Sequence, residues 1–151
     1  LAGDDRTEVV QADLRDPEAV LADPTVRGLL DLSRPTAVLM VAVLHFVPDE
    51  DDPAGLVARF RKAVPADSYL ALSHATAGER ADRAAEHRGL YRRTATPMTM
   101  RTREQVERLF DGWEMVEPGL VYLPQWRPEP GSPELDRPER MPGLAGVGRK
   151  P

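Results

Sequence analysis

The chain of 151 residues contains no cysteine, which excludes a disulfide framework and thiolate chemistry. Basic residues are not in excess: the formal net charge is -5, so nucleic acid is not expected as the main partner. No apolar run reaches the roughly 18 residues that a membrane-spanning helix needs, and no segment resembles a signal peptide. We therefore expect a cytoplasmic protein with neither nucleic-acid nor membrane partners.

Several motifs that identify common enzyme classes are also absent. The sequence has no G-x-G-x-x-G, no phosphate-binding loop and no G-x-S-x-G nucleophile elbow. It does contain four consecutive acidic residues, Asp49 to Asp52, directly before a proline. Their charge suits the positive N-terminal end of a following helix, and we predict that role for them and no metal site.

The composition is that of a single folded domain. Hydrophobic residues make up 41% and charged residues 30% of the chain, and its length is enough to bury about two thirds of the unfolded surface. The first three residues, Leu1-Ala2-Gly3, are typical of a helix end closed by glycine. We therefore expect a fragment whose N-terminal part is missing.

Local patterns predict alternating strands and helices. Asp-Pro pairs at 16–17, 23–24 and 52–53 are typical helix starts, and capping boxes at Thr76/Glu79 and Thr102/Gln105 predict helices to about residue 93 and to Gly112. The predicted strands lie near residues 8–12, 36–43 and 68–74, and residues 113–118 and 120–126 are predicted to form a hairpin about Pro118-Gly119.

This order predicts an α/β fold whose sheet is mostly parallel and ends in an antiparallel hairpin. The unbroken apolar run at 36–43 predicts a strand covered on both faces. Ligands of such sheets bind outside the carboxyl ends of the strands. The residues that follow the predicted strands, at 13–14, 45–46 and 73–74, are therefore the candidates for a site.

The last 25 residues have a different composition. Residues 127–151 contain six prolines and four glycines with few apolar residues. Such a segment buries too little surface to offset its ordering entropy, so we predict a disordered tail. The chain is thereby divided into a folded part, 1–126, and a tail, 127–151.

Two candidate residues have both a functional and a structural interpretation. A carboxylate at Asp13 could accept hydrogen bonds from an adenine amino group or ribose hydroxyls, or it could cap the next turn. His45 could act as a general base, or it could be a packed histidine beside a core phenylalanine. Ser73 and His74 are not predicted to act as a catalytic pair, since neighbouring strand residues point to opposite faces.

Four segments together carry a family resemblance: VVQADLRDP, VLMVAVLHFVPDEDDPAG, YLALSHAT and FDGWEMVEPGLVYLPQWRP. They resemble the class I S-adenosylmethionine-dependent methyltransferases, and more narrowly the methyltransferase family first catalogued as a domain of unknown function in actinobacteria. The signature is LHFVPDEDDP. The resemblance implies a Rossmann-like sheet of strand order 3-2-1-4-5-7-6 with an antiparallel seventh strand, of which strands 1 and 2 are missing from this chain.

The resemblance also implies a cofactor and site residues. The cofactor is S-adenosyl-L-methionine, with Asp13 near its adenine, Leu14 beside that residue, and Val41, Ala42 and Val43 along its methionine side. His45 matches a histidine that acts as base in some O-methyltransferases. The implied activity is methyl transfer to a small-molecule acceptor. The glycine-rich loop and the acidic residue that complete the cofactor site are absent, so we expect the isolated chain to be inactive.

Two alternatives to a methyltransferase remain open. One is a non-catalytic member that binds the cofactor or has a regulatory role. The other is a different doubly wound nucleotide-binding enzyme, such as a dehydrogenase, which a glycine-rich fingerprint upstream of Leu1 would favour. With strands 1 and 2 missing, the strand at 36–43 would expose an apolar edge, and we expect the chain to form homo-oligomers through it.

Overall fold

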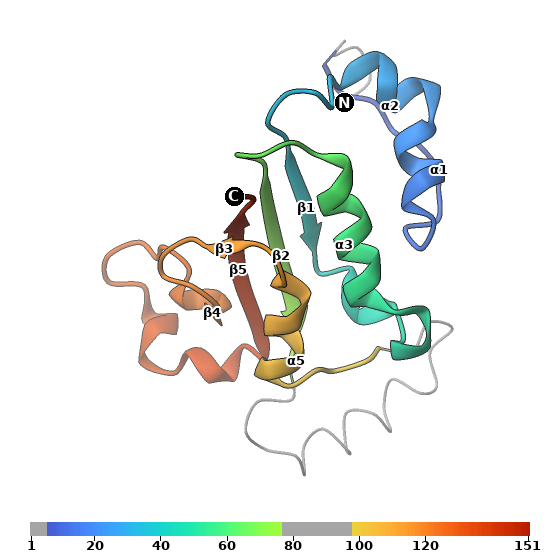
Figure 1. Cartoon of the computed structure of the whole chain (residues 1–151). Coiled ribbons are helices and arrows are strands. Elements are labelled where there is room, and N and C mark those ends of the chain that lie inside the picture. Colours follow the sequence, from blue (N-terminus) through green and yellow to red (C-terminus); the bar gives the residue numbers. More distant parts are fainter. Residues whose placement is uncertain (1–5, 77–97) are drawn as a thin grey trace.

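A computed structural model describes residues 6–76 and 98–151, which form an α/β fold around one five-stranded mixed sheet (Figure 1). The strand order is β1-β2-β5-β3, and β4 also pairs with β5. The strands are β1 (Ala37–Val41), β2 (Tyr69–Ala75), β3 (Glu114–Met115), β4 (Val121–Tyr122) and β5 (Gly143–Arg149). The α-helices are α1 (Pro17–Ala22), α2 (Pro24–Leu29), α3 (Pro53–Ala63) and α5 (Arg103–Glu107). The 3-10 helices are η1 (Leu44–Phe46), η2 (Asp49–Asp51), η3 (Arg108–Phe110), η4 (Leu123–Gln125), η5 (Pro133–Asp136) and η6 (Pro138–Arg140).

The helix starts predicted from Asp-Pro pairs are confirmed. The side chains of Asp16, Asp23 and Asp52 each accept a hydrogen bond from a backbone N–H in the first turn of α1, α2 and α3. At α5 the predicted capping box is also present, because the Thr102 and Gln105 side chains each bond the other residue's backbone N–H. These caps satisfy N–H groups that have no partner within the helix.

The hydrophobic core lies on one face of the sheet. Figure 1 shows α3 and α5 on the same side of the strands. Their side chains, with those of η3, pack against the strand residues of that face. The fully buried members of this core are Met40, Leu44, Leu56, Val57, Leu70, Val106 and Leu144.

The other face of β1 is open, contrary to the prediction of a strand covered on both faces. Leu39 and Val41 point away from α3 and are 67% and 60% exposed, whereas Met40 between them is 2% exposed. In the described sheet, β1 is an edge strand that pairs with β2 alone. The apolar composition of a segment predicts a strand, but it does not show whether other elements cover both faces of that strand. In β1 only one face is covered.

The predicted disordered tail is wrong at residues 143–149, which form β5. This strand pairs antiparallel with β2 along seven residues and also borders β3 and β4. The glycines of β5 led to the prediction of disorder, and they also allow the strand to pack. A Cβ at Gly146 would lie 2.9 Å from Met115 Cε, and one at Gly148 would lie 2.7 Å from Trp113 Cβ. The glycines thus let these side chains pack directly on the strand backbone.

The predicted hairpin is also wrong in its pairing. β3 and β4 exist, but each pairs with β5 and not with the other. The sheet is mixed as a result, with β1 and β2 the parallel pair, rather than mostly parallel. The order β1-β2-β5-β3 corresponds to 4-5-7-6 of the resembled sheet, with β5 taking the place of the seventh strand.

Residues 8–12 do not form the predicted strand. They have no regular secondary structure, and Val9 is 83% exposed. A strand needs a hydrogen-bonded neighbour, and no strand of the described sheet pairs with this segment. The helix predicted from Thr76 to about residue 93 lies largely outside the described residues. Among residues 6–76 and 98–151, no helix is long and apolar enough to span a membrane.

We predict that Gly148→Ala lowers the free energy of unfolding by about 1–3 kcal/mol, because the added methyl group overpacks the contact with Trp113. The matched control is Gly28→Ala in α2, where a Cβ meets nothing within 4 Å. That change should be neutral or stabilise by up to about 1 kcal/mol, since alanine favours helix over glycine. Urea unfolding of both variants measures the difference, and equal effects would contradict the packing of β5.

Candidate active site

A cavity of about 160 Å³ lies at the carboxyl ends of β1 and β2, beside the start of β5. This is the edge of the sheet at which α/β proteins bind their ligands. Most of its lining is apolar, with two imidazole rings and one hydroxyl group. The lining residues are Ala42, His45, Ser73, His74, Ala75, Leu123, Met141, Pro142 and Gly143.

A tight turn after β1 directs the chain toward the cavity. Ala42 adopts the left-handed conformation at φ +52°, which is unfavourable for a residue with a Cβ. Its backbone N–H donates to the Ser73 hydroxyl at 3.0 Å and to the Ser73 carbonyl at 3.3 Å. These bonds join the ends of β1 and β2 and place η1, which carries His45, at the cavity.

His45 is buried, with 6% of its surface exposed. Its Nδ1 atom is buried without a hydrogen-bond partner among the described residues. Its ring lies edge-on to Phe46 at 4.4 Å and to His74 at 5.6 Å between ring centroids. Burial, and then the positive charge of Arg101, hold the pKa of His45 below its ordinary value. The imidazole is therefore neutral at pH 7 and can accept a proton.

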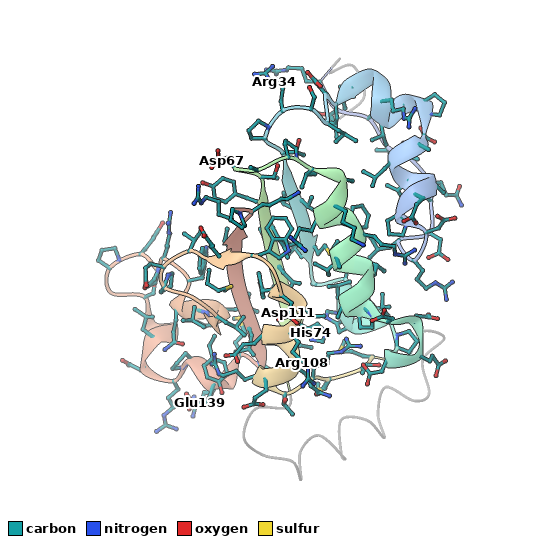
Figure 2. The ribbon with its side chains drawn as sticks, viewed as in Figure 1. Arg34, Asp67, His74, Arg108, Asp111 and Glu139 are labelled. Atoms are coloured by element: carbon teal, nitrogen blue, oxygen red, sulfur yellow. The ribbon has the colours of Figure 1, made fainter. Side chains whose placement is uncertain are left out.

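His74 is held on both sides of its ring. Its Nδ1 lies 2.7 Å from the Ala75 carbonyl, which can only accept, so Nδ1 carries the proton. Its Nε2 then accepts from Arg101 Nη1 at 2.8 Å. Burial is the main cause that lowers the pKa of His74 to about 4. Figure 2 shows His74 toward the opposite end of the sheet from Asp67. Its ring nitrogens are both engaged, so His74 is not free to act as a base.

Arg101 lies beneath the turn that carries His45 and is 2% exposed. Besides His74, its guanidinium bonds the carbonyls of Leu44 and Val47 and the carboxylate of Asp49. Sequence reasoning missed this residue, since an arginine before a helix cap normally faces solvent. It also missed Leu123 and residues 141–143, the latter because they were assigned to a disordered tail.

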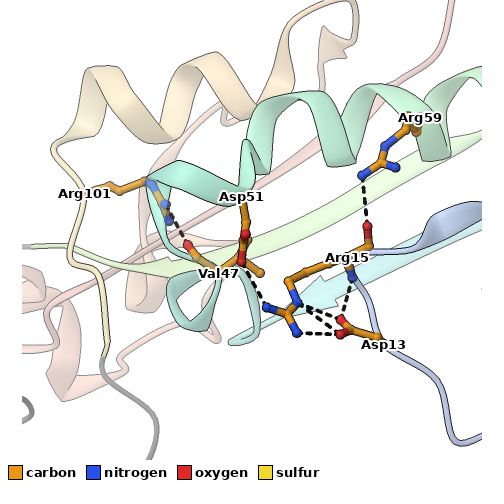
Figure 3. Close-up of polar contacts among 6 residues, drawn as sticks. All are labelled: Asp13, Arg15, Val47, Asp51, Arg59 and Arg101. Carbon is orange, nitrogen blue, oxygen red and sulfur yellow. Dashed lines mark hydrogen bonds and ion pairs between the residues drawn. The ribbon is translucent and has the colours of Figure 1, made fainter.

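Asp13 and Leu14 do not line the cavity. Both carboxylate oxygens of Asp13 are bonded by Arg15, at 2.6 to 3.1 Å, as Figure 3 shows. These bonds lower the pKa of Asp13 to about 2. Arg15 Nη1 also reaches Asp51 at 3.2 Å, which brings this segment to the turn after η1. Leu14 is half-buried and packs against the core.

Only some of the site residues predicted at the carboxyl end of β1 lie at the cavity. Ala42 and His45 line the same cavity. Val43 is half-buried against the core, and Val41 lies on the exposed face of β1. Among the residues that the structure describes, no group of three or more His, Asp or Glu side chains is placed to bind a metal ion.

A second hollow, of about 1190 Å³, lies between α1, the segment around Leu30 and the last turn of α3. Its lining residues precede β1 and β2 in the chain, which places it at the amino ends of these strands. Parallel strands of α/β sheets bind ligands at the opposite ends. The cavity at His45 is therefore the candidate site.

Comparison with known proteins shows which family model the sequence matches and which solved structures share its fold. A family model described as S-adenosyl methyltransferase matches residues 1–151. The chain is 40% identical to a DUF574 family protein from Streptomyces avermitilis MA-4680, with a TM-score of 0.86 over 94% of this chain and 54% of that one. It is 37% identical to a protein from Thermobifida fusca YX that is inferred to be a methyltransferase, with a TM-score of 0.87 over 99% of this chain and 56% of that one.

The chain thus spans about half the length of these two relatives. An S-adenosylmethionine-dependent methyltransferase from Methanosarcina mazei, 14% identical, shares the fold with a TM-score of 0.55, over 80% of this chain and 60% of that one. No curated protein matches the sequence.

The burial of neutral His74 predicts acid sensitivity. Below pH 6.5 the unfolded chain protonates this side chain, whereas the folded protein does so only near pH 4. Stability present above pH 6.5 is therefore lost as the pH falls toward 4, by up to roughly 3 kcal/mol. In His74→Gln, whose amide oxygen can still accept from Arg101, this part of the pH dependence should disappear. Urea unfolding between pH 4 and 7 tests it, and equal pH dependence in both proteins would contradict it.

Proposed function

The chain belongs to the S-adenosyl methyltransferase family, and we propose that the protein transfers the methyl group of S-adenosyl-L-methionine to a small-molecule acceptor held at the cavity beside His45. The observation that carries the proposal is a buried, neutral imidazole that lines a largely apolar cavity at the carboxyl ends of β1 and β2, and whose Nδ1 has no hydrogen-bond partner among the described residues. This is the place and the chemistry that proton removal from an acceptor requires.

The cavity fits only part of the cofactor. Sites that enclose a whole ligand of this size measure about 300–1,000 Å³, whereas this cavity measures about 160 Å³. We assign to it the reacting end, where methyl group and acceptor meet. Val41, Ala42 and Val43 would lie along the methionine side. Asp13 would approach the adenine and Leu14 would pack beside it, provided that Arg15 releases the Asp13 carboxylate.

When bound, the cofactor would supply a methyl group on a positively charged sulfur, and an acceptor nucleophile would take that methyl group by in-line attack while the sulfur leaves as a neutral thioether. The chain's own residues have three tasks. Leu123 and Met141, which line the cavity, would exclude water once the ligands are bound. The turn at Ala42 fixes where the acceptor can approach. His45 takes the proton of a hydroxyl or a protonated amine as that group becomes the nucleophile.

A small acceptor suits the site better than a nucleic acid. The cavity walls are mostly apolar, and the net charge of -5 disfavours a phosphate backbone. We accordingly propose small phenols, alcohols or amines as the acceptor class.

If His45 is the base, His45→Ala in the full-length protein should lower turnover by about 10²–10⁴-fold with cofactor affinity unchanged. Formation of S-adenosylhomocysteine with a panel of phenols and amines measures turnover, and calorimetry measures binding. A loss of cofactor affinity with turnover at saturation intact would show that His45 only forms the cavity wall. Absence of turnover with every acceptor, together with retained cofactor binding, would favour a non-catalytic member.

Asp13 and Arg15 give opposite expectations for cofactor binding. Asp13→Ala should weaken it by about 1–3 kcal/mol, the cost of a lost charged hydrogen bond. Arg15→Ala removes the side-chain bonds to the Asp13 carboxylate and should strengthen binding or leave it unchanged. Asp31→Ala is the matched control, because Asp31 also bonds a residue two positions later but lies before β1. Unchanged affinity in Asp13→Ala would remove Asp13 from the site.

A further inference from the structure

We infer that Arg101 is the positioning residue of this site, because its buried guanidinium ties the turn that carries His45 to His74 at the end of β2. This inference deepens the proposed function and rests on it for the catalytic importance of His45. The arrangement itself rests on contacts that involve neither cofactor nor acceptor.

The first observation is that the guanidinium uses all of its donors. Nη1 donates to the Leu44 carbonyl at 3.1 Å and to His74 Nε2 at 2.8 Å. Nη2 donates to the Val47 carbonyl at 2.8 Å and to Asp49 Oδ1 at 2.7 Å, and Nε donates to the same oxygen at 3.1 Å. These five bonds use every N–H of the side chain, and four of them end on residues 44–49.

The second observation is that the backbone around Arg101 is fixed as well. Its N–H lies 3.4 Å from the Ala75 carbonyl, and its own carbonyl accepts from the Thr76 hydroxyl at 2.9 Å. Two residues earlier, Thr99 N–H donates to the His45 carbonyl at 2.7 Å. Residues 99–101 thus bind the turn through three of its main-chain carbonyls and are themselves held at the end of β2. Figure 3 shows Arg101 reaching the carbonyl of Val47.

The third observation is that burial of the Arg101 charge has a free-energy cost. The Arg101 side chain is 3% exposed, whereas that of its ion-pair partner Asp49 is 67% exposed. A buried charge paired in this way adds little net stability, because desolvation offsets the attraction. A hydrophobic side chain could fill the same space, but it could not bond two carbonyls, a carboxylate and an imidazole at once. The contacts therefore point to placement of the turn rather than to stability.

The consequence for the site is a fixed pair of imidazoles. The Ala75 carbonyl keeps the His74 proton on Nδ1, and Arg101 donates to Nε2, so neither ring nitrogen can take the proton intended for His45. The charged and titratable groups that face His45 in the described residues are His74 and Arg101, and Arg101 is itself paired with Asp49. Removal of the guanidinium should therefore loosen the turn that carries His45 relative to the end of β2.

Histidine NMR of the 151-residue chain tests the inference, since the sequence holds three histidines in all. The variants are Arg101→Lys, which keeps the charge but not the fork, and Arg101→Gln, which loses both. In both we expect the cross-relaxation between the His45 and His74 rings to weaken. The pKa of His45 should rise toward 6.5 in Arg101→Gln and stay lower in Arg101→Lys.

The matched control is Arg149→Gln, which removes an exposed arginine that bonds Asp67 and Glu114 at the other end of β5 and should change none of these signals. If both Arg101 variants fail to fold, Asp49→Asn keeps the guanidinium and should speed amide exchange at Phe46 and Val47 relative to Arg149→Gln.

A folded Arg101→Gln protein with unchanged cross-relaxation between the two rings and unchanged His45 titration would overturn the inference, as would unchanged exchange in Asp49→Asn. Because these signals need no cofactor, a protein that fails to methylate leaves this test intact. Likewise, NMR results that contradict the role of Arg101 do not decide whether the protein transfers methyl groups.

Discussion

The buried guanidinium of Arg101 constrains the end of the sheet where the candidate site lies. Each of its N–H groups needs an acceptor away from water, and the fold supplies them from the turn after β1, from the end of β2 and from Asp49. Because these acceptors come from separate elements, they can meet at one side chain only if β1 and β2 keep their register and η1 keeps its turn. The position of His45 therefore depends on the register of β1 and β2 and on the turn of η1.

A second constraint acts from the other side of β2. β5 closes the cavity with Gly143 and the residues before it, and it can do so because its glycines let Phe110 and Trp113 pack against its backbone. The core and the cavity are therefore linked through one strand. The face that carries Gly146 and Gly148 is covered by η3 and the residues after it, and the start of the same strand forms a wall of the site.

The sequence predicts the parts of this fold that depend on local chemistry. Asp-Pro pairs and the Thr102/Gln105 box fix helix starts through bonds to the nearest turn, and these predictions are confirmed. The apolar run at 36–43 likewise identifies β1, because composition is also a local property of the chain. β5 could not be predicted in this way, because glycine and proline content indicates disorder unless distant aromatic side chains cover the backbone. Arg101 was missed likewise, since its acceptors lie more than 50 residues earlier in the chain, apart from His74.

Methyl transfer at the cavity beside His45 requires the methyl group of the bound cofactor to lie close to the His45 ring. Nuclear Overhauser effects from S-adenosylmethionine with a carbon-13-labelled methyl group, bound to the full-length protein, show where that methyl group lies. We expect contacts to the His45 ring and to the side chains of Leu123 and Met141. Contacts to Leu29 and Leu30, which line the hollow before β1, with none to His45, would contradict it.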